Sequence, residues 1–142
     1  MNVTIRKFGY PATLIKELDH WAILLRPAQV TLGSLVLAAK SEATAYGQLS
    51  PDAFGEQAGA IASIESSLAK FCQFERINYL MLMMVDPNVH FHVIPRYQQA
   101  RTWRNLDFPD AGWPGPPKLE SAIKLADDEI REMVAELSHI YQ

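Results

Sequence analysis

The chain has 142 residues, of which 49% are hydrophobic and 20% are charged, and its formal net charge is -3 at pH 7. This composition is ordinary for a globular protein, so it excludes a fibrous or an intrinsically disordered chain. The length fits a single domain, 1–142, and the mild negative charge disfavours a general nucleic-acid-binding protein, whose surface is usually basic.

The first third of the chain predicts a hairpin and a third strand. Residues 12–18 and 21–25 are strand-like and are separated by a two-residue turn. Residues 26–29 break the pattern because proline cannot donate to a β ladder, and residues 33–38 restart an extended segment. Gly33 has two interpretations here, as a turn residue that needs a positive φ or as backbone placed close to a bound ligand.

A long helix is predicted next. Ser50 is a capping hydroxyl, Pro51 suits the first helical position, and the Asp52 carboxylate lies near the positive end of the helix. We expect the helix to run to about Phe71. Its apolar residues recur at steps of three and four and predict one stripe that covers a sheet. This stripe consists of Phe54, Ala58, Ile61, Ile64, Leu68 and Phe71.

A second hairpin follows the helix. Residues 76–85 are almost continuously apolar, which predicts an interior strand with both faces covered. A turn at residues 86–87 then brings residues 88–96 back antiparallel beside it. Strand alternation sends the apolar side chains of this return strand to the core and its polar side chains to the other face. The polar face holds Asn88, His90 and His92.

Residues 98–142 form a proline-rich segment and a C-terminal helix. Trp103, Phe108 and Trp113 either cover the edge of the core or line a pocket. The helix is expected over about 128–141, with Asp127 as its cap. Its apolar face consists of Ile130, Met133, Val134, Leu137 and Tyr141.

Two features bear on the compartment. Residues 1–10 contain no apolar stretch of signal-peptide length, and the longest hydrophobic run, residues 79–85, is too short to cross a bilayer. The single cysteine, Cys72, cannot form an internal disulfide, and we expect a structural thiol that is buried or partly exposed. The expectation is a cytoplasmic protein with no membrane association.

Two histidines two residues apart on one strand face have Cβ atoms roughly 7 Å apart, so His90 and His92 can address one ligand. One chemistry is metal binding, but a further ligand is needed, and none of the candidates stands at a spacing that singles it out. Those candidates are His20, His139, Asp86 and several glutamates. The other is attack by a neutral imidazole on phosphorus, helped by the second histidine. Two ordinary surface histidines on an edge strand are the third interpretation.

The run His-Phe-His-Val-Ile-Pro-Arg at residues 90–96 resembles the second half of the histidine triad (HIT) signature. Residues 30–37 are similar to the glycine-containing strand of that family, and residues 49–52 to the start of its long helix. The resemblance covers about residues 13–97 and is closest to the fragile-histidine-triad branch of dinucleoside polyphosphate hydrolases. It implies an α+β fold, an antiparallel sheet of about five strands covered by a long helix, with a second helix at the C-terminus.

The resemblance also implies a function. His90 falls on the nucleophile, which forms a nucleotidyl-histidine, and His92 falls on the residue that contacts the phosphate and the leaving group. Family members cleave nucleoside phosphates at the α-phosphorus, including dinucleoside polyphosphates, phosphoramidates and adenylylated groups. No cofactor is required, although a divalent cation can accompany the substrate phosphates, and a homodimer is expected.

Three departures from the family pattern limit this expectation. Asn88 replaces the first histidine of the triad and cannot shuttle a proton, Ser34 replaces a histidine of the glycine strand, and the glycine-glutamine loop before the signature is absent. Asn88, Ser34 and Arg96 are the expected substrate contacts. Preorganised donors are usually a large part of catalysis, so two functions stay open. One is a nucleotide hydrolase or nucleotidyl transferase; the other is a nucleotide-binding or interaction protein with weak or lost catalysis. A metal-dependent enzyme is the third.

Overall fold

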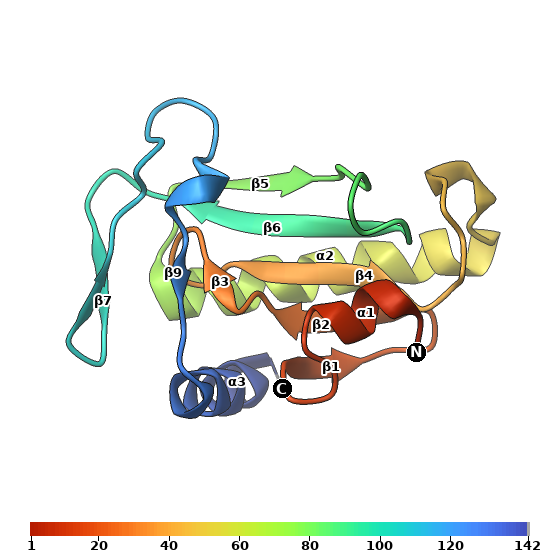
Figure 1. Ribbon diagram of the computed structural model, residues 1–142, viewed down its shortest axis with the longest axis horizontal. Coiled ribbons are helices and arrows are strands. Elements are labelled where there is room, and N and C mark those ends of the chain that lie inside the picture. Colours follow the sequence, from red (N-terminus) through yellow and green to blue (C-terminus); the bar gives the residue numbers. More distant parts are fainter. Residues whose placement is uncertain (142) are drawn as a thin grey trace.

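The computed structural model describes residues 1–141, and its centre is a five-stranded antiparallel sheet in the order β1-β2-β4-β6-β5 (Figure 1). The strands of this sheet are β1 (Leu14–Glu17), β2 (Trp21–Leu25), β4 (Leu35–Ala39), β5 (Arg76–Leu80) and β6 (His90–Arg96). The long helix α2 (Pro51–Cys72) covers one face, and the helix α3 (Asp127–Tyr141) contacts α2 and β1. The predicted α+β class, five strands and two helices are confirmed.

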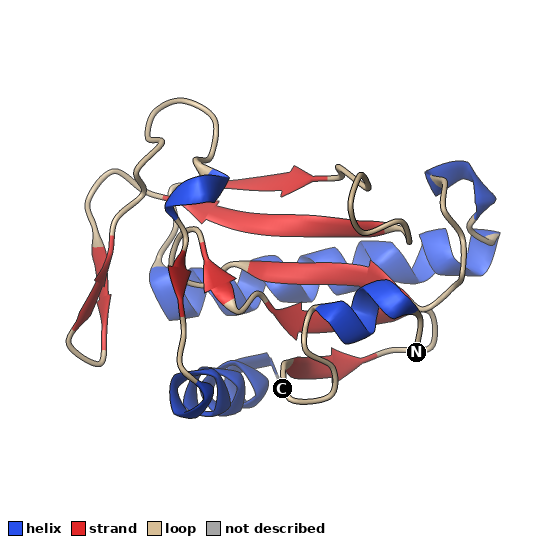
Figure 2. Cartoon of the chain, viewed as in Figure 1, coloured by secondary structure: helices blue, strands red, loops and turns tan. Residues whose placement is uncertain are grey.

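Several short elements complete the fold (Figure 2). The helix α1 (Val3–Lys7) lies on the sheet face opposite α2. The remaining pieces are β3 (Ala28–Gln29) paired with β9 (Ile123–Lys124), β7 (Arg101–Trp103) paired with β8 (Leu106–Phe108), and the 3-10 turns η1 (Tyr46–Gln48) and η2 (Leu119–Ser121). None was predicted, because segments of two to five residues are too short to show a hydrophobic period.

The start of α2 confirms the predicted cap. Ser50 Oγ accepts a hydrogen bond from the backbone N–H of Ala53 at 3.1 Å. The predicted apolar stripe is wrong in its first half, because Phe54 is 38% exposed and Ala58 is exposed. The fully buried Trp21 of β2 donates its indole N–H to the carbonyl of Ala53 at this end of the helix, and Phe54 packs against the exposed Tyr46 instead. The buried face is therefore rotated, and it consists of Ala53, Gln57, Ala60, Ile64, Ser67, Leu68 and Cys72.

The prediction of an interior strand over residues 76–85 is wrong. β5 ends at Leu80 and lies at the edge of the sheet, and β6 separates it from β4. The apolar run continues as a loop in which Leu82, Met84 and Val85 are 51%, 87% and 80% exposed. The interior strand of this hairpin is β6, so the interpretation of its histidines as surface residues of an edge strand is also wrong.

The sheet has two different layers on its two faces. Phe91 and Val93 of β6 belong to the large core between the sheet and the helices α2 and α3. The opposite face carries a small apolar cluster beneath α1, formed by Ile5, Ala22, Leu24, Val36 and Ala38. The ring of Phe8, at the end of α1, packs on this side against His90 and His92. The predicted alternation along the histidine strand is therefore confirmed.

Of the three aromatic residues predicted to cover the core or line a pocket, two cover the core. The third, Trp113, is half-buried and lines a hollow of about 450 Å³ that also borders Arg96. Phe108 is fully buried, and Trp103 is 9% exposed with its indole N–H donating to Glu136 on α3. The helix α3 is present as predicted, and its Met133 and Leu137 are buried, but Asp127 is its first residue and not its cap. The N–H of Ala126, the residue before the helix, donates to the Glu129 carboxylate. Cys72 is buried, and burial raises the pKa of its thiol to about 12, as expected for a structural residue. Within residues 1–141, no helix has the length and apolar character needed to span a bilayer.

Candidate active site

The register of three neighbouring strands sets the surroundings of the two histidines. Ala38 of β4 lies opposite His90, and Val36 lies opposite His92. Small side chains next to His90 leave room above the sheet, and Phe8 occupies it, with its ring centroid 5.4 Å from His90 and 5.7 Å from His92. The two imidazole centroids are 5.1 Å apart. His90 and His92 are 1% and 7% exposed, so both rings are fixed within the fold.

The hydrogen bond of His90 defines its tautomer. Its Nδ1 lies 2.7 Å from the backbone carbonyl of Asn88. A carbonyl oxygen can only accept, so Nδ1 carries a proton, and in the neutral ring Nε2 has the free electron pair. This is the tautomer that nucleophilic attack through Nε2 needs.

His92 has the opposite tautomer. Arg26 Nε donates to its Nδ1 at 3.3 Å, and a guanidinium can only donate, so Nδ1 is unprotonated and the single proton is on Nε2. Burial, and then the charge of Arg26, lowers the pKa of His92 to about 4, with a smaller lowering by His90 and an opposing rise from Asp86. When both rings are neutral, the pair therefore combines a free electron pair on His90 with an N–H donor on His92.

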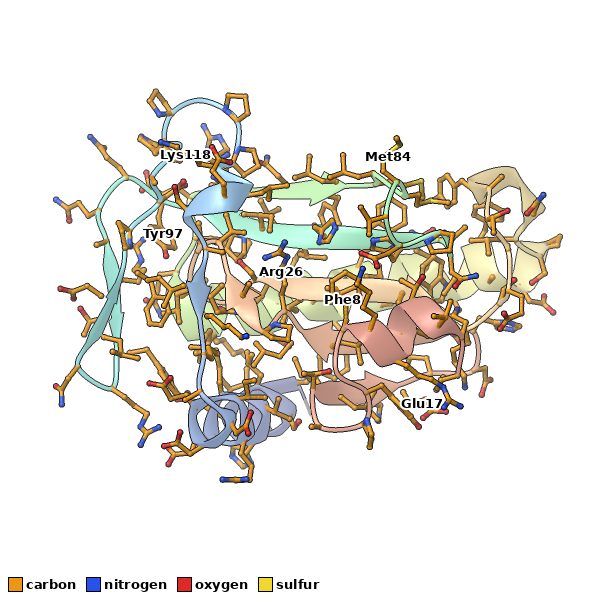
Figure 3. The ribbon with its side chains drawn as sticks, in the orientation of Figure 1. Phe8, Glu17, Arg26, Met84, Tyr97 and Lys118 are labelled. Atoms are coloured by element: carbon orange, nitrogen blue, oxygen red, sulfur yellow. The ribbon has the colours of Figure 1, made fainter. Side chains whose placement is uncertain are left out.

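Arg26 is a half-buried cation at the end of β2. Besides His92, it donates to the carbonyl of Ala28, and within residues 1–141 it forms no ion pair with a carboxylate. Burial lowers the pKa of its guanidinium below the ordinary value. Figure 3 labels Arg26 and Phe8, which come from different elements and lie on the same side of the sheet.

These groups line a cleft of about 280 Å³. One wall is the loop after β5, which is apolar except for Asp86, and the Asp86 carboxylate is held by Lys7 Nζ at 2.8 Å. Met84 lies on this loop (Figure 3). The lining residues are Phe8, Arg26, Leu82, Met83, Met84, Val85, Asp86, His90, His92 and Leu119. A larger hollow of about 520 Å³ beside α3 is lined by no histidine, so the smaller cleft, which both histidines line, is the candidate active site.

Asn88 lies just before β6 and is buried, but its amide group faces the fold. Its Oδ1 accepts from the Thr4 hydroxyl at 3.0 Å, and its Nδ2 donates to the carbonyl of Glu42 at 3.1 Å. The side chain therefore ties α1 to the segment after β4. The contribution of Asn88 to the site is its backbone carbonyl, which orients His90.

Ser34 is not placed for the expected substrate contact. Its fully buried hydroxyl donates to the carbonyl of Thr31 at 2.8 Å and accepts from the Thr31 N–H at 3.1 Å, which closes the turn before β4. Gly33 has φ +91, and a Cβ there would lie 3.1 Å from Leu68. The glycine therefore serves the turn and faces the core, and its interpretation as backbone close to a ligand is wrong.

Arg96 also lies away from the cleft, four residues beyond His92 and so about 13 Å along the strand. It is 4% exposed, and its Nε and Nη2 donate to the two oxygens of Asp110 at 2.7 and 3.0 Å. Further donations go to Asn78 Oδ1 at 2.8 Å and to the Gly115 carbonyl at 2.9 Å. Arg96 therefore clamps the proline-rich segment onto the sheet, with four hydrogen bonds to protein acceptors.

Of the metal-ligand candidates, only Asp86 lies at the cleft, where it is paired with Lys7. Within residues 1–141, no three His, Cys, Asp or Glu side chains are grouped closely enough to hold a metal ion.

Sequence reasoning missed Phe8 and Arg26. Phe8 follows a helix that is too short to predict. Arg26 could have been found, because Ala22, Leu24 and position 26 alternate onto one face, and Leu24 pairs with Val36, the neighbour of His92. The following proline had marked this position only as the end of the strand.

No family model matches the sequence, and no curated relative matches it. Solved structures do. A histidine triad protein from Bradyrhizobium japonicum matches with a TM-score of 0.76 at 16% identity, over 100% of this chain and 97% of its own. A histidine triad protein from Sinorhizobium meliloti 1021 matches with a TM-score of 0.75 at 20% identity, over 98% of this chain and 94% of its own. A hypothetical histidine triad nucleotide-binding protein from Sulfolobus tokodaii strain 7 matches with a TM-score of 0.68 at 16% identity, over 91% of this chain and 83% of its own. The chain therefore has the fold of the histidine triad proteins.

Proposed function

We propose that this protein is a nucleotide hydrolase or nucleotidyl transferase that acts at the α-phosphorus of a nucleoside phosphate derivative, of the dinucleoside polyphosphate or phosphoramidate type. One observation carries the proposal: the Asn88 carbonyl holds His90 so that its unprotonated Nε2 is free beside the Nε2–H of His92. The nucleotide-binding description of the Sulfolobus tokodaii protein supports the choice of ligand.

In this mechanism the electron pair on His90 Nε2 attacks phosphorus and forms an N–P bond. The bond from phosphorus to the leaving group breaks, and its electron pair departs with that group. The Nδ1–H of His90 remains bonded to the Asn88 carbonyl, which stabilises the positive charge that the ring gains. The Nε2–H of His92 donates to a phosphoryl oxygen.

The second step releases the nucleotide. Water attacks phosphorus, the N–P electron pair returns to His90, and the proton of the water passes to solvent. In a transferase an alcohol or an amine takes the place of water. The mechanism requires no cofactor, and a divalent cation can accompany the substrate phosphates. The first histidine of the triad is not used, because the carbonyl of Asn88 orients the nucleophile.

The test is turnover of diadenosine triphosphate and adenosine 5′-phosphoramidate by the full chain. We expect release of AMP, and we expect His90→Ala to lower kcat/KM by at least about 100-fold because the nucleophile is removed. Mass spectrometry of quenched wild-type enzyme should show a nucleotidyl group on His90. His139→Ala, at an exposed histidine outside the cleft, is the matched control. Unchanged turnover in His90→Ala would refute the assignment.

The second candidate is a nucleotide-binding protein with weak or lost catalysis. It is favoured by the apolar wall of the cleft, in which Leu82, Met83, Met84 and Val85 offer no side-chain donors to a phosphate. Calorimetric binding of AMP, together with no turnover of either substrate and no adduct on His90, would establish it. Turnover that depends on His90 would exclude it.

We further propose that the protein is a homodimer in the cytoplasm. The edge strand β5 leaves one side without a strand partner, and the exposed Leu82, Met84 and Val85 follow it directly, as expected beside an interface. Light scattering should give about twice the 16.0 kDa chain mass. A monomer at millimolar concentration would contradict the dimer, and cell fractionation tests the compartment.

A further inference from the structure

Arg26 is the charged group of the cleft that lacks a countercharge. The other two charges at the cleft, Lys7 and Asp86, neutralise each other across 2.8 Å. The guanidinium of Arg26 instead donates to a neutral ring and a carbonyl, and within residues 1–141 no carboxylate pairs with it. Keeping an unpaired cation half-buried is costly, and a forked guanidinium matches the geometry of phosphate oxygens. The position is thus suited to the phosphate chain of a substrate.

The same residue controls the proton on His92. Its Nε–H points at His92 Nδ1, so a second proton on the ring would set two N–H donors against each other. The groups that face His92 are Arg26 directly after β2, His90 from its own strand, Asp86 from the loop after β5, and the uncharged ring of Phe8. Arg26 opposes the imidazolium, and the opposing effect of Asp86 is smaller.

A neutral His92 limits which leaving groups the cleft can release. A leaving phosphate has a second pKa of about 6, so it departs as an anion without a proton. The ammonium form of a leaving amine has a pKa of about 10, so the amine is a strong base and its anion is far too basic to depart. Its nitrogen must therefore gain a proton as the bond to phosphorus breaks. His92 in the neutral form can donate a hydrogen bond to either group, but transferring its only proton would leave an imidazolate.

We propose that Arg26 binds the departing phosphate and holds His92 in its neutral Nε2–H form, so that the site selects nucleoside polyphosphates over phosphoramidates. In the favoured step, the P–O bond to the leaving phosphate breaks, its electron pair stays on that oxygen, and Arg26 offsets the new charge. In the disfavoured step, the P–N electron pair needs a proton that no group facing His92 supplies. This inference rests on the proposed nucleotide chemistry.

The first test measures the tautomer of His92 and the affinity for phosphate, and it does not depend on turnover. Long-range ¹H–¹⁵N correlation spectra of the full chain should show His92 as the Nε2–H tautomer in the wild type and as a mixture in Arg26→Met. Titration with inorganic phosphate should shift the His90 and His92 signals in the wild type, with affinity lowered about 10- to 100-fold in Arg26→Met, the loss of one charge-assisted contact. Arg131→Met, which removes an exposed charge on α3, should behave as the wild type.

The second test compares kcat/KM for diadenosine triphosphate and adenosine 5′-phosphoramidate. We expect the wild type to favour the triphosphate, and Arg26→Met to reduce that preference by about 10-fold or more, because it loses the phosphate contact and frees His92 to take a proton. Guanidinium added to Arg26→Ala should restore part of the preference. A general structural defect would lower both substrates together and would not respond to guanidinium.

The outcomes separate this inference from the proposed function. A wild-type preference for the phosphoramidate, an unchanged preference in Arg26→Met, or an unchanged His92 tautomer would overturn the role of Arg26. Turnover of neither substrate, or full turnover in His90→Ala, would instead refute the proposed function. In that case the tautomer and the phosphate titration would still decide whether Arg26 is an anion-binding residue.

Discussion

Two arginines contact the region of the histidine strand β6, and their partners differ. Arg96 makes four side-chain hydrogen bonds, two of them to the carboxylate of Asp110, and is almost fully buried. Arg26 contacts a neutral histidine and one carbonyl, and it borders an open cleft. An arginine that makes most of its hydrogen bonds to protein, two of them to a buried carboxylate, holds the fold together, whereas one that lacks a carboxylate partner and has most of its donors unused beside a cleft can bind a ligand. Four predictions test this distinction.

The largest effect is expected for Arg96→Met. It leaves Asp110 as a buried charge without its partner, so the free energy of unfolding should fall by about 3–5 kcal/mol in urea denaturation. Arg26→Met removes a cation with no carboxylate partner and should change stability by no more than about 1 kcal/mol. Arg104→Met, which breaks the exposed pair with Glu132, is the control and should cost at most about 1 kcal/mol. Equal losses in the Arg26 and Arg96 variants would remove the distinction.

The second effect is acid destabilisation through His92. Its pKa is about 4 when folded against about 6.5 when unfolded, so between these values the unfolded chain binds more protons. The stabilisation is complete above pH 6.5 and is lost as pH falls toward 4, by about 3 kcal/mol in total. Denaturation curves at pH 7.5, 5.5 and 4 should show a shallower acid slope in His92→Asn. His139→Asn, on the exposed side of α3, should keep the wild-type slope.

Local patterns predicted the elements that depend on neighbours in sequence. The Ser50 cap and the alternation of His90 and Phe91 follow from one turn or one strand, and the structure confirms them. The stripe on α2 failed at Phe54 because the helix places Ala53 beside the buried Trp21, far away in the sequence, and leaves Phe54 packed against the exposed Tyr46. The apolar run after Leu80 failed because a strand and a cleft-lining loop can share the same composition.

Of the cleft residues, the sequence predicted only the two histidines on strand β6. Spacing and resemblance singled out His90 and His92, and the structure brings both to one cleft. Ser34 and Arg96 also came from the motif, but their partners, Thr31 and Asp110, are fixed by the turn before β4 and by the proline-rich segment. The residues of the motif do not predict either of these hydrogen-bonded pairs. Polar residues near a signature are therefore assigned to a site only after their donors and acceptors have been accounted for.

Asn88→Ala is expected to separate the two contributions of this residue. Losing its amide removes the donor to the Glu42 carbonyl and the acceptor of the Thr4 hydroxyl proton, although Thr4 Oγ1 still accepts from the backbone N–H of residue 88. The free energy of unfolding should therefore fall by about 1–3 kcal/mol. The backbone carbonyl remains, so His90 should keep its tautomer in ¹⁵N spectra and kcat should fall by less than about 10-fold. A large loss of kcat in protein that is still folded would show that the amide itself acts on the substrate.

The smallest effect is expected for Ser34→Ala. The variant loses the hydroxyl that bonds both the carbonyl and the N–H of Thr31, so unfolding should become easier by about 1 kcal/mol. Because this hydroxyl is fully buried in the turn before β4, KM for a nucleotide substrate should not change. Ser50→Ala, which removes the cap of α2 at a similar cost of about 1 kcal/mol, provides a comparison outside the cleft. A raised KM with unchanged stability would show that Ser34 contacts the substrate, as proposed for Arg26, and does not serve the fold alone, as Arg96 does.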